Sequence, residues 1–374
     1  MTIYTVKQGD TLYSIGKRYG VTIEQLLSAN GQTVQPSLII GQAVIIPTSA
    51  DSKPNKLING YAYPFIQNEA LNSTLDYLSL ITPFSYGVTQ NGTLLDLDDQ
   101  SLIDTALARG VKPLLLVTSL TEQGSFSSER AAAVLSDTAL GDTLISSITQ
   151  KLKTQSYYGV DIDFEYIPQQ YGAEYAEFIA RLKAAVGEDY KVFVSVAPKT
   201  SAMQRGLLYE AHNYKALGAA ADYILVMTYE WGYTYGPPMA VAPINKVREV
   251  LEYAVTEIPP QKLLMGIPNY AYDWTLPFEK GDAARSLSNN SAVELARTRG
   301  AEIMFDPISQ TPYFNYYDDN ANRHVVWFED AKSINAKAEL LKELNLAGAS
   351  VWNVMNFYKP LYTVLSENFN ITKL

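Results

Sequence analysis

Eight strand-like segments alternate with helical segments between residues 57 and 354, and this alternation constrains the fold more than any other feature. Amphipathic stretches such as 173–186 and 244–256 separate most of the apolar strand candidates. Such an alternation over about 315 residues is typical of a barrel in which helices surround eight parallel strands. We therefore predict an α/β fold, a (β/α)8 TIM barrel. Its strands are expected at 57–64, 77–83, 113–118, 159–166, 191–197, 223–229, 263–270 and 349–354.

One interval is too long for a simple connection between strands. Roughly 80 residues separate the seventh and eighth strand candidates, against the few residues of an ordinary loop. They include strand-like pieces at 302–305, 313–317 and 324–328. We predict an α+β insertion after strand 7, at about residues 275–330. It should stand on the C-terminal face of the barrel as one wall of a cleft.

The first 48 residues form a module of their own. A strand-like stretch at 3–6 precedes a helix that Asp10 or Thr11 can cap and that ends at Gly20. Residues 22–25 (Thr-Ile-Glu-Gln) fit a capping box that starts a second helix, and 43–46 returns as a strand. We predict a βααβ domain at 1–48, a polar linker at 49–55 and the barrel at 56–374.

This module resembles a LysM domain over its whole length. The resemblance rests on Tyr4-Thr5-Val6, Gly9-Asp10-Thr11-Leu12, Ile15, Tyr19-Gly20-Val21, 26–30 and 38–47. LysM domains bind polymers that contain N-acetylglucosamine, either peptidoglycan or chitin. The alternative is a small structural domain without a ligand. The resemblance implies a glycan groove between a turn and a loop, formed by Gly9, Asp10, Thr11, Leu12, Leu38, Ile39, Ile40 and Gly41.

Three carboxylates occupy alternate positions of the predicted fourth strand. Asp161, Asp163 and Glu165 therefore point to one face of that strand. Like charges inside a barrel repel one another and lose hydration, so a chain built only for stability would carry apolar residues there. The alternative, a solvated face of an edge strand, requires that no barrel surrounds it. Glu165 lies nearest the mouth, and an ionised Asp163 would raise its pKa and keep it protonated as a general acid.

The same segment resembles the Asp-Gly-x-Asp-x-Asp-x-Glu signature of glycoside hydrolase family 18, which lies on the fourth barrel strand. The first Asp of that pattern is Tyr158 here, at the position farthest from the mouth. Met227-Thr228-Tyr229 ends the sixth strand and is similar to the Met-x-Tyr element of the family. Ser350-Val351-Trp352 ends the eighth strand, where the family has a Trp that forms the floor of the sugar-binding site.

The resemblance implies a retaining mechanism in which the substrate's own acetamido group is the nucleophile, one of the exceptions to the two-carboxylate scheme. Glu165 would donate the proton, Asp163 and Tyr229 would orient the acetamide, and Asp161 would share a proton with Asp163. Trp352 would bind the sugar ring. No cofactor and no metal is implied. Further candidates at or just past strand ends are Tyr63, Tyr86, Glu230, Trp231, Asn269, Tyr270, Tyr272 and Asn353.

Charge and composition exclude several partners. The net charge is −10 and no run of Lys or Arg is present, so we expect no nucleic-acid partner. No stretch approaches 18 consecutive apolar residues, so we expect no membrane insertion, and no signal peptide is recognisable. The sequence has no cysteine, which excludes disulfides and thiolate metal sites. His212 and His324 lie far apart, and neither belongs to a metal-binding motif.

The order of a LysM ahead of a family 18 barrel is similar to that of spore-cortex peptidoglycan hydrolases of endospore-forming bacteria. Residues 59–61 and 226–231 also resemble that group, whose members act as N-acetylglucosaminidases on cortex fragments during germination. The resemblance implies a location in the spore coat, cortex or cell wall. A chitinase and a non-catalytic sugar-binding protein remain the alternatives. The short linker predicts that the LysM acts as a tether, which would raise the local substrate concentration.

Overall fold

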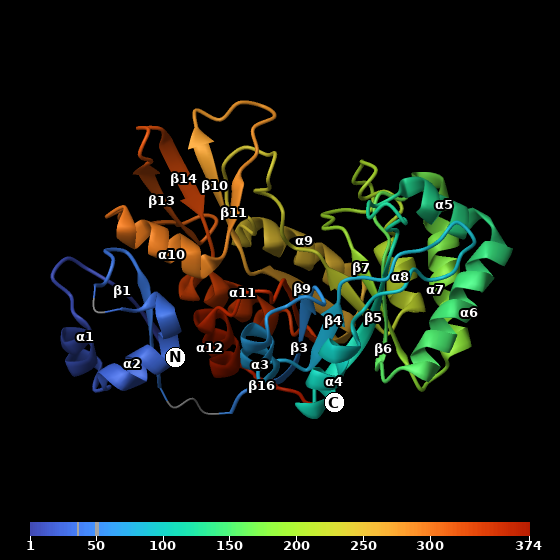
Figure 1. The fold of residues 1–374 in the computed structure, drawn as a ribbon, viewed down its shortest axis with the longest axis horizontal. Coiled ribbons are helices and arrows are strands. Elements are labelled where there is room, and N and C mark those ends of the chain that lie inside the picture. The colour runs from blue at the N-terminus through green and yellow to red at the C-terminus, as the bar shows by residue number, and fades with distance from the viewer. Residues whose placement is uncertain (36, 49–51) are drawn as a thin grey trace.

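The structure is a computed structural model that describes residues 1–35, 37–48 and 52–374. Residues 49–51 of the predicted linker lie outside the described residues. Figure 1 shows a barrel, an upright antiparallel sheet beside it, and a small module that lies against both. In the part of the chain that is described, no helix is long and apolar enough to cross a membrane.

Eight parallel strands close into a barrel because β15 pairs with both β9 and β3. The predicted TIM barrel is therefore confirmed. Each strand starts within three residues of its predicted start, because an apolar run marks each one in the sequence. The strands are β3 (Asn55–Ala62), β4 (Leu80–Pro83), β5 (Lys112–Thr118), β6 (Gly159–Asp163), β7 (Lys191–Val196), β8 (Tyr223–Val226), β9 (Leu263–Pro268) and β15 (Gly348–Trp352).

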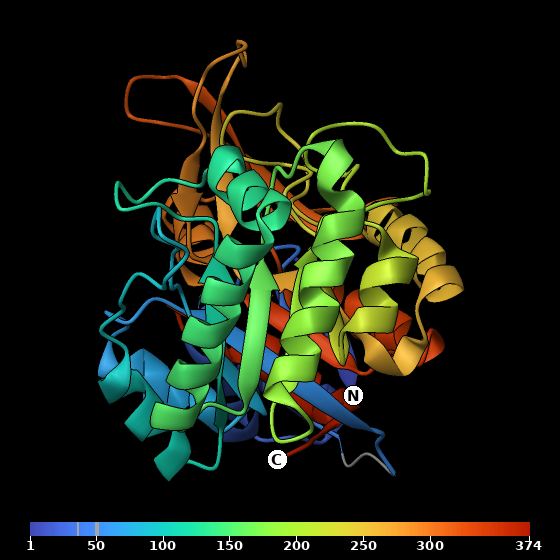
Figure 2. The same cartoon turned by 90° about the vertical axis from the view of Figure 1, so that its right-hand side faces the viewer.

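Helices cover the outside of the barrel and bury one apolar stripe each. In α7, for example, Tyr175, Phe178, Ile179 and Leu182 repeat with helical spacing and are fully buried. Figure 2 shows α6 and α7 side by side in front of the strands. The barrel helices are α3 (Asn68–Leu75), α4 (Gln100–Ala108), α5 (Ser128–Ser136), α6 (Thr138–Thr154), α7 (Gly172–Val186), α8 (Tyr214–Ala220), α9 (Ile244–Glu257), α11 (Ala331–Glu343) and α12 (Lys359–Asn368).

The long interval after β9 forms a five-stranded antiparallel sheet with one helix, in the order β11-β10-β14-β13-β12. Its sheet has a hydrophobic core of its own, in which Val293 and Ala296 of the helix pack against Phe314 and Val326. The sheet begins at Ala271, a few residues before the predicted start at about 275. Its elements are β10 (Ala271–Leu276), β11 (Arg285–Leu287), α10 (Asn289–Thr298), β12 (Met304–Asp306), β13 (Thr311–Tyr317) and β14 (Arg323–Trp327).

The N-terminal module has the predicted strand-helix-helix-strand order. Thr11 caps the first helix, and Thr22 and Gln25 form the predicted capping box with reciprocal hydrogen bonds of 2.8 and 3.2 Å. The Asn30 side chain exchanges hydrogen bonds with both backbone groups of Ile45 and so joins the second helix to the second strand. The elements are β1 (Thr2–Thr5), α1 (Leu12–Tyr19), α2 (Ile23–Asn30), η1 (Gly31–Thr33) and β2 (Ala43–Ile46).

The module is docked on the rest of the chain. Ala29 and Ile45 are buried in the main hydrophobic cluster of the barrel, and Ile39 is buried in that of the inserted sheet. Asn55, which the sequence placed at the end of the linker, is the first residue of β3. Packing against two other parts of the chain therefore holds the module in place. That the module raises the local substrate concentration stays a prediction.

Candidate active site

The three carboxylates of the acidic segment lie at the carboxyl end of β6. Asp161 and Asp163 belong to the strand, and Glu165 follows two residues beyond its end. The intervening Ile162 and Phe164 are fully buried in the hydrophobic cluster between strands and helices. This alternation, with period two, turns the acidic side chains to the barrel interior and places Glu165 at the mouth.

Asp161 is buried and has two hydroxyl donors. The Tyr61 hydroxyl donates to its Oδ2 at 2.5 Å, and Ser195 Oγ donates from 3.3 Å. Burial raises the pKa of Asp161 to about 6, although both hydrogen bonds act in the opposite direction. We expected Asp161 to share a proton with Asp163. In the structure Asp161 accepts hydrogen bonds from Tyr61 and Ser195, and the shared proton stays a prediction.

Asp163 and Glu165 are the charged groups at the floor of the cleft. Burial, and then the charges of Glu165 and Asp161, raise the pKa of Asp163 well above its ordinary value. Burial raises the pKa of Glu165 to about 7, so desolvation and not the neighbouring charge is the main cause. Within the described chain, Asp163 Oδ1 is buried and has no hydrogen-bond partner. Both shifts favour retention of a proton by the pair, next to an acceptor atom that has no partner.

Tyr229 and Trp352 complete the floor of the cleft. Tyr229 follows β8 and is close to β9 at Gly266, where a Cβ atom would lie 2.7 Å from Tyr229 Cε1. Trp352 ends β15, and its ring centroid lies 5.6 Å from that of Tyr61 and 5.1 Å from that of Phe84. Aromatic rings and carboxylates thus surround one spot, as expected for a site that binds a sugar.

The cleft consists of two adjoining hollows that share Tyr63, Glu230 and Trp352. The larger, of about 940 Å³, holds Asp163, Glu165 and Tyr229, and the smaller, of about 380 Å³, extends toward the inserted sheet. Of the described residues that line them, Asp163, Glu165 and Glu230 are charged and none is Lys or Arg. The cleft therefore offers aromatic faces, hydroxyls, amides and negative charge.

Most of the predicted sugar-binding candidates line this cleft. Glu230 accepts hydrogen bonds from the hydroxyls of Tyr270 and Tyr272, which fixes a carboxylate at the border of the two hollows. Asn269 has less to offer a ligand, because its amide already donates to the carbonyls of Asn353 and Asn356. The candidates that line one or both hollows are Tyr63, Glu230, Trp231, Asn269, Tyr270, Tyr272, Trp352 and Asn353.

Tyr86 is the candidate that the structure places elsewhere. Its side chain is 1% exposed, and its hydroxyl bonds to Asp99 and to Tyr157, each at 3.0 Å. It does not line the cleft, and the expectation that it contacts sugar is corrected. The loop that follows β4 places its ring in the hydrophobic cluster between the barrel and its helices.

Sequence reasoning missed an aromatic group on the loops around the mouth. The larger hollow is also lined by Phe84, Phe126, Tyr166, Tyr209 and Tyr233. These residues lie in irregular loops where no periodicity marks them. Position in the chain offers a signal for two of them. Phe84 directly follows the end of β4, and Tyr166 directly follows Glu165.

The LysM candidates divide into buried and accessible groups. Leu12 and Ile39 are 7% exposed and belong to hydrophobic cores, so their side chains cannot contact a glycan. Thr11 caps α1, Asp10 accepts hydrogen bonds from Tyr4 and Lys7, and Gly9 is exposed. Ile40 is 40% exposed, while Leu38 and Gly41 are half-buried.

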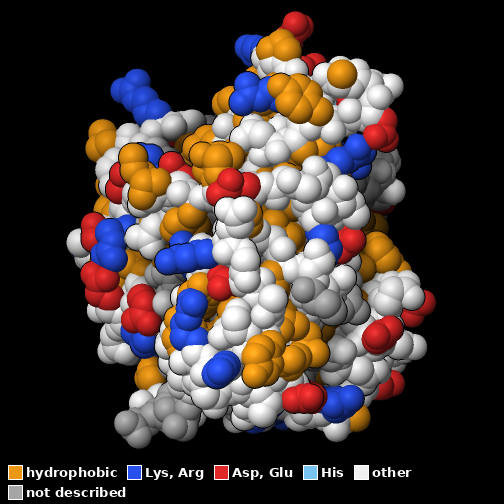
Figure 3. Space-filling model, turned by 90° about the vertical axis from the view of Figure 1, so that its left-hand side faces the viewer, with side chains coloured by type: hydrophobic (Ala, Val, Ile, Leu, Met, Phe, Trp, Pro, Cys, Tyr) orange, Lys and Arg blue, Asp and Glu red, His pale blue; other side chains and the backbone are white. Residues whose placement is uncertain are grey.

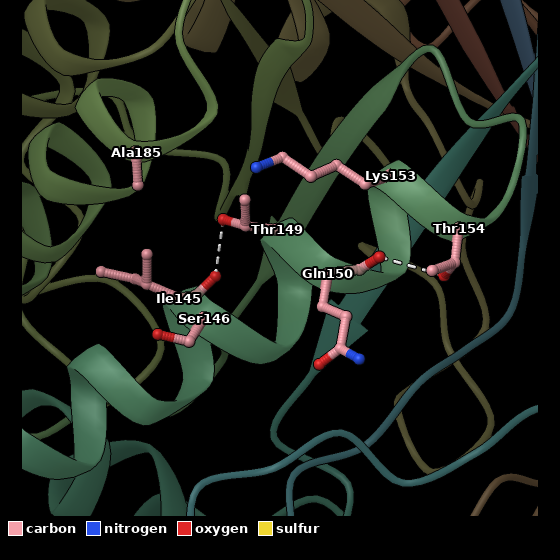
Figure 4. A pocket seen from close by; sticks show the side chains of 7 residues that line it. All are labelled: Ile145, Ser146, Thr149, Gln150, Lys153, Thr154 and Ala185. Atoms are coloured by element: carbon pink, nitrogen blue, oxygen red, sulfur yellow. Dashed lines mark hydrogen bonds between the residues drawn. The ribbon is translucent and has the colours of Figure 1, made fainter.

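A further hollow lies away from the cleft. A hollow of about 560 Å³ on the outer surface between α6 and α7 (Figure 4) is lined by one lysine, apolar groups and side chains such as Thr149 and Thr154 that bond within α6. The described residues contain no group of three His, Asp or Glu side chains placed to hold a metal ion.

Comparison with known proteins agrees with this geometry. Residues 84–356 match glycosyl hydrolases family 18, and residues 4–47 match the LysM domain. The cortical fragment-lytic enzyme of Bacillus subtilis (strain 168) is 36% identical over 100% of this chain and 99% of its own length. That of Bacillus anthracis is 34% identical over 99% of both. The crystal structure of the Bacillus cereus spore cortex-lytic enzyme SleL matches with a TM-score of 0.94 and 31% identity, over 100% and 99% of the chains.

The closed parallel barrel carries an acidic fourth strand, and most of the barrel matches the family model. These features define a glycoside hydrolase. The chain belongs to glycosyl hydrolases family 18 and carries a LysM domain ahead of the barrel. The inferred resemblances to both are confirmed.

Proposed function

We propose that this chain is a retaining N-acetylglucosaminidase that cleaves cortex peptidoglycan during spore germination, located in the spore coat, cortex or cell wall. The observation that carries the chemistry is the pairing of Glu165, with its raised pKa, and Asp163, whose buried Oδ1 is unsatisfied. The substrate assignment is supported by the cortex-lytic relatives, which match from end to end.

In the first step the acetamido oxygen of the bound N-acetylglucosamine attacks the anomeric carbon. The bond to the leaving oxygen breaks, and Glu165 gives that oxygen its proton. An ionised Asp163 accepts the acetamide N–H through its free oxygen and stabilises the positive charge of the oxazolinium that forms. The Tyr229 hydroxyl donates to the acetamide and fixes its orientation.

In the second step the Glu165 carboxylate removes a proton from water, which attacks the anomeric carbon from the face that the leaving group vacated. The bond between that carbon and the acetamido oxygen breaks, which restores the acetamide. The two displacements together retain the β configuration. Asp161 stays bonded to Tyr61 and Ser195, and its charge tunes the pKa of Asp163. The mechanism requires an N-acetylated sugar on the non-reducing side of the cleaved bond.

A chitinase would use the same groups, because chitin supplies the same acetamide. The test is release of reducing ends from purified cortex fragments and from chitin by wild-type protein. Release from cortex fragments and not from chitin is expected, and the opposite result would replace the substrate assignment. NMR detection of the α-anomer as first product would exclude acetamide participation.

The third possibility is a sugar-binding protein without activity. It is disfavoured because the terminal glutamate of the acidic segment is present and lies in the cleft. Absence of turnover on cortex fragments, chitin and soluble oligomers, together with retained binding to a polymer, would establish that reading.

A further inference from the structure

The LysM domain contacts the catalytic domain through polar bonds as well as apolar packing. Thr363 of α12 donates through Oγ1 to the Ala29 carbonyl at 2.8 Å, and the Ile303 amide donates to the Ile40 carbonyl at 2.9 Å. Gly41 is so close to the insertion that a Cβ atom there would lie 1.7 Å from the Ile303 carbonyl oxygen. One wall of the expected glycan groove, 38–41, is therefore fixed to the inserted sheet.

Arg297, near the end of α10, is a charged residue at this contact. It donates through Nη2 to the Thr33 carbonyl at 2.8 Å and through Nε to the Ser37 carbonyl at 3.2 Å. Its side chain is 12% exposed and pairs with Glu294 one turn earlier. The planar guanidinium thus binds two carbonyls of the LysM domain, which lie just ahead of the groove residues 38–41 in the chain. On this side of the molecule, acidic, basic and apolar side chains are interspersed (Figure 3).

The opposite end of the same helix belongs to the catalytic cleft. Ser288 caps α10 and lines the smaller hollow beside Trp352. Asn289 bonds to Asn269 and to the Glu329 amide, and Asn290 bonds to the Phe357 carbonyl in the turn after β15. A helix of this length spans on the order of 15 Å. A single rigid element therefore connects the cleft to the LysM loop.

We propose that α10 fixes the LysM groove relative to the cleft, with Arg297 as the positioning residue, so that a bound polymer is presented to the cleft in one orientation. This inference rests on the proposed function, because it requires the LysM and the cleft to engage the same N-acetylglucosamine polymer. When both sites belong to one rigid body, a polymer bound at the LysM domain needs no further reorientation to reach the cleft. A flexible tether would leave that reorientation to chance.

The test compares Arg297→Ala with Arg299→Ala, whose guanidinium lies at the same helix end but pairs with Asp319 within the insertion. Three quantities are measured for each: hydrolysis of a soluble N-acetylglucosamine tetramer, hydrolysis of purified cortex fragments, and binding to cortex. We expect Arg297→Ala to lower kcat/KM on cortex roughly tenfold, with tetramer hydrolysis and cortex binding unchanged. Arg299→Ala should match wild type in all three, and Arg297→Lys should restore part of the loss.

Amide hydrogen exchange at Ile303 reports docking directly, because this amide bonds across the contact. Faster exchange is expected in Arg297→Ala, and in Arg297→Ala/Thr363→Val if the single change is insufficient. Unchanged protection in both variants would overturn the role of Arg297. Faster exchange with undiminished cortex hydrolysis would overturn the functional inference. If wild type hydrolyses neither the tetramer nor cortex fragments, the proposed function itself fails.

Discussion

The Tyr61 hydroxyl donates a 2.5 Å hydrogen bond to Asp161, from the first barrel strand to the fourth. The resemblance to family 18 pairs this same carboxyl with Asp163. The hydrogen bond from Tyr61 also lowers the pKa of Asp161 against the effect of burial. The charge next to Asp163 is thus set by a tyrosine that lies outside the acidic segment.

Replacing Tyr61 by Phe should lower kcat/KM by about 10- to 100-fold, the equivalent of one hydrogen bond to a charged group. The Phe ring keeps the contact with Trp352, so substrate affinity should change little. The acid limb of the pH profile should move to higher pH, because Asp161 loses the donor that lowers its pKa. Ser195→Ala, which removes the longer 3.3 Å bond, is the matched comparison and should have a smaller effect. An unchanged profile in Tyr61→Phe would contradict this role.

Replacing Glu165 by Gln should reduce hydrolysis of cortex fragments about 100- to 10,000-fold, the range for loss of a general acid. Binding to the polymer should persist, because the amide keeps the shape and the LysM is untouched. Turnover and sedimentation with cortex are measured on the same preparation. Residual turnover close to wild type would remove Glu165 from the proton-donor role.

Hydrolysis by wild type should decline as the pH rises through about 7, since burial raises the pKa of Glu165 to about 7 and the acid must be protonated. The Glu165→Gln variant cannot show this limb. A basic limb that lies near the ordinary carboxyl value of 4.5 would refute the assignment.

The same pKa shift predicts a pH-dependent stability difference. A carboxyl whose pKa is raised on folding stabilises the protein fully below its unfolded value of about 4.5, and this contribution is lost as the pH rises through about 7. At pH 8, Glu165→Gln should therefore be more stable than wild type by about 1–3 kcal/mol. At pH 4 the two proteins should unfold together. Thermal unfolding at both pH values measures this, and equal differences at both would be inconsistent with a buried charge.

Tyr86→Phe should leave kinetic constants unchanged and cost about 1–3 kcal/mol of unfolding free energy, because it removes bonds to buried Asp99 and Tyr157. Tyr63→Ala should instead leave the unfolding free energy nearly unchanged. It should raise KM about tenfold, since the Tyr63 ring lines both hollows. Urea unfolding and steady-state kinetics separate the two effects. A raised KM in Tyr86→Phe would show that its position has been misjudged.

The barrel could be predicted from sequence because each strand is a short apolar run between amphipathic helices, and that signal is local. The acidic strand could be predicted for the same reason, since a period of two fixes which side chains share a face. Asp161, Asp163 and Glu165 therefore lie together as expected.

Contacts between distant segments could not be predicted in this way. The partner of Asp161 is 100 residues away, and the contact of Arg297 with Thr33 joins residues 264 apart. Tyr86 shows a different limit. Periodicity indicates that a residue is at a strand end, but the course of the next loop decides whether its ring enters the cleft.

The lining of the cleft has a further consequence. Its charged members among the described residues are all carboxylates, so attraction between opposite charges does not draw a glycan into it. Affinity must come from stacking on rings, from hydrogen bonds to hydroxyl and amide groups, and from the release of water. Such forces are barely screened by dissolved ions. The affinity of the catalytic domain for its substrate should therefore be about the same in dilute buffer and in concentrated salt.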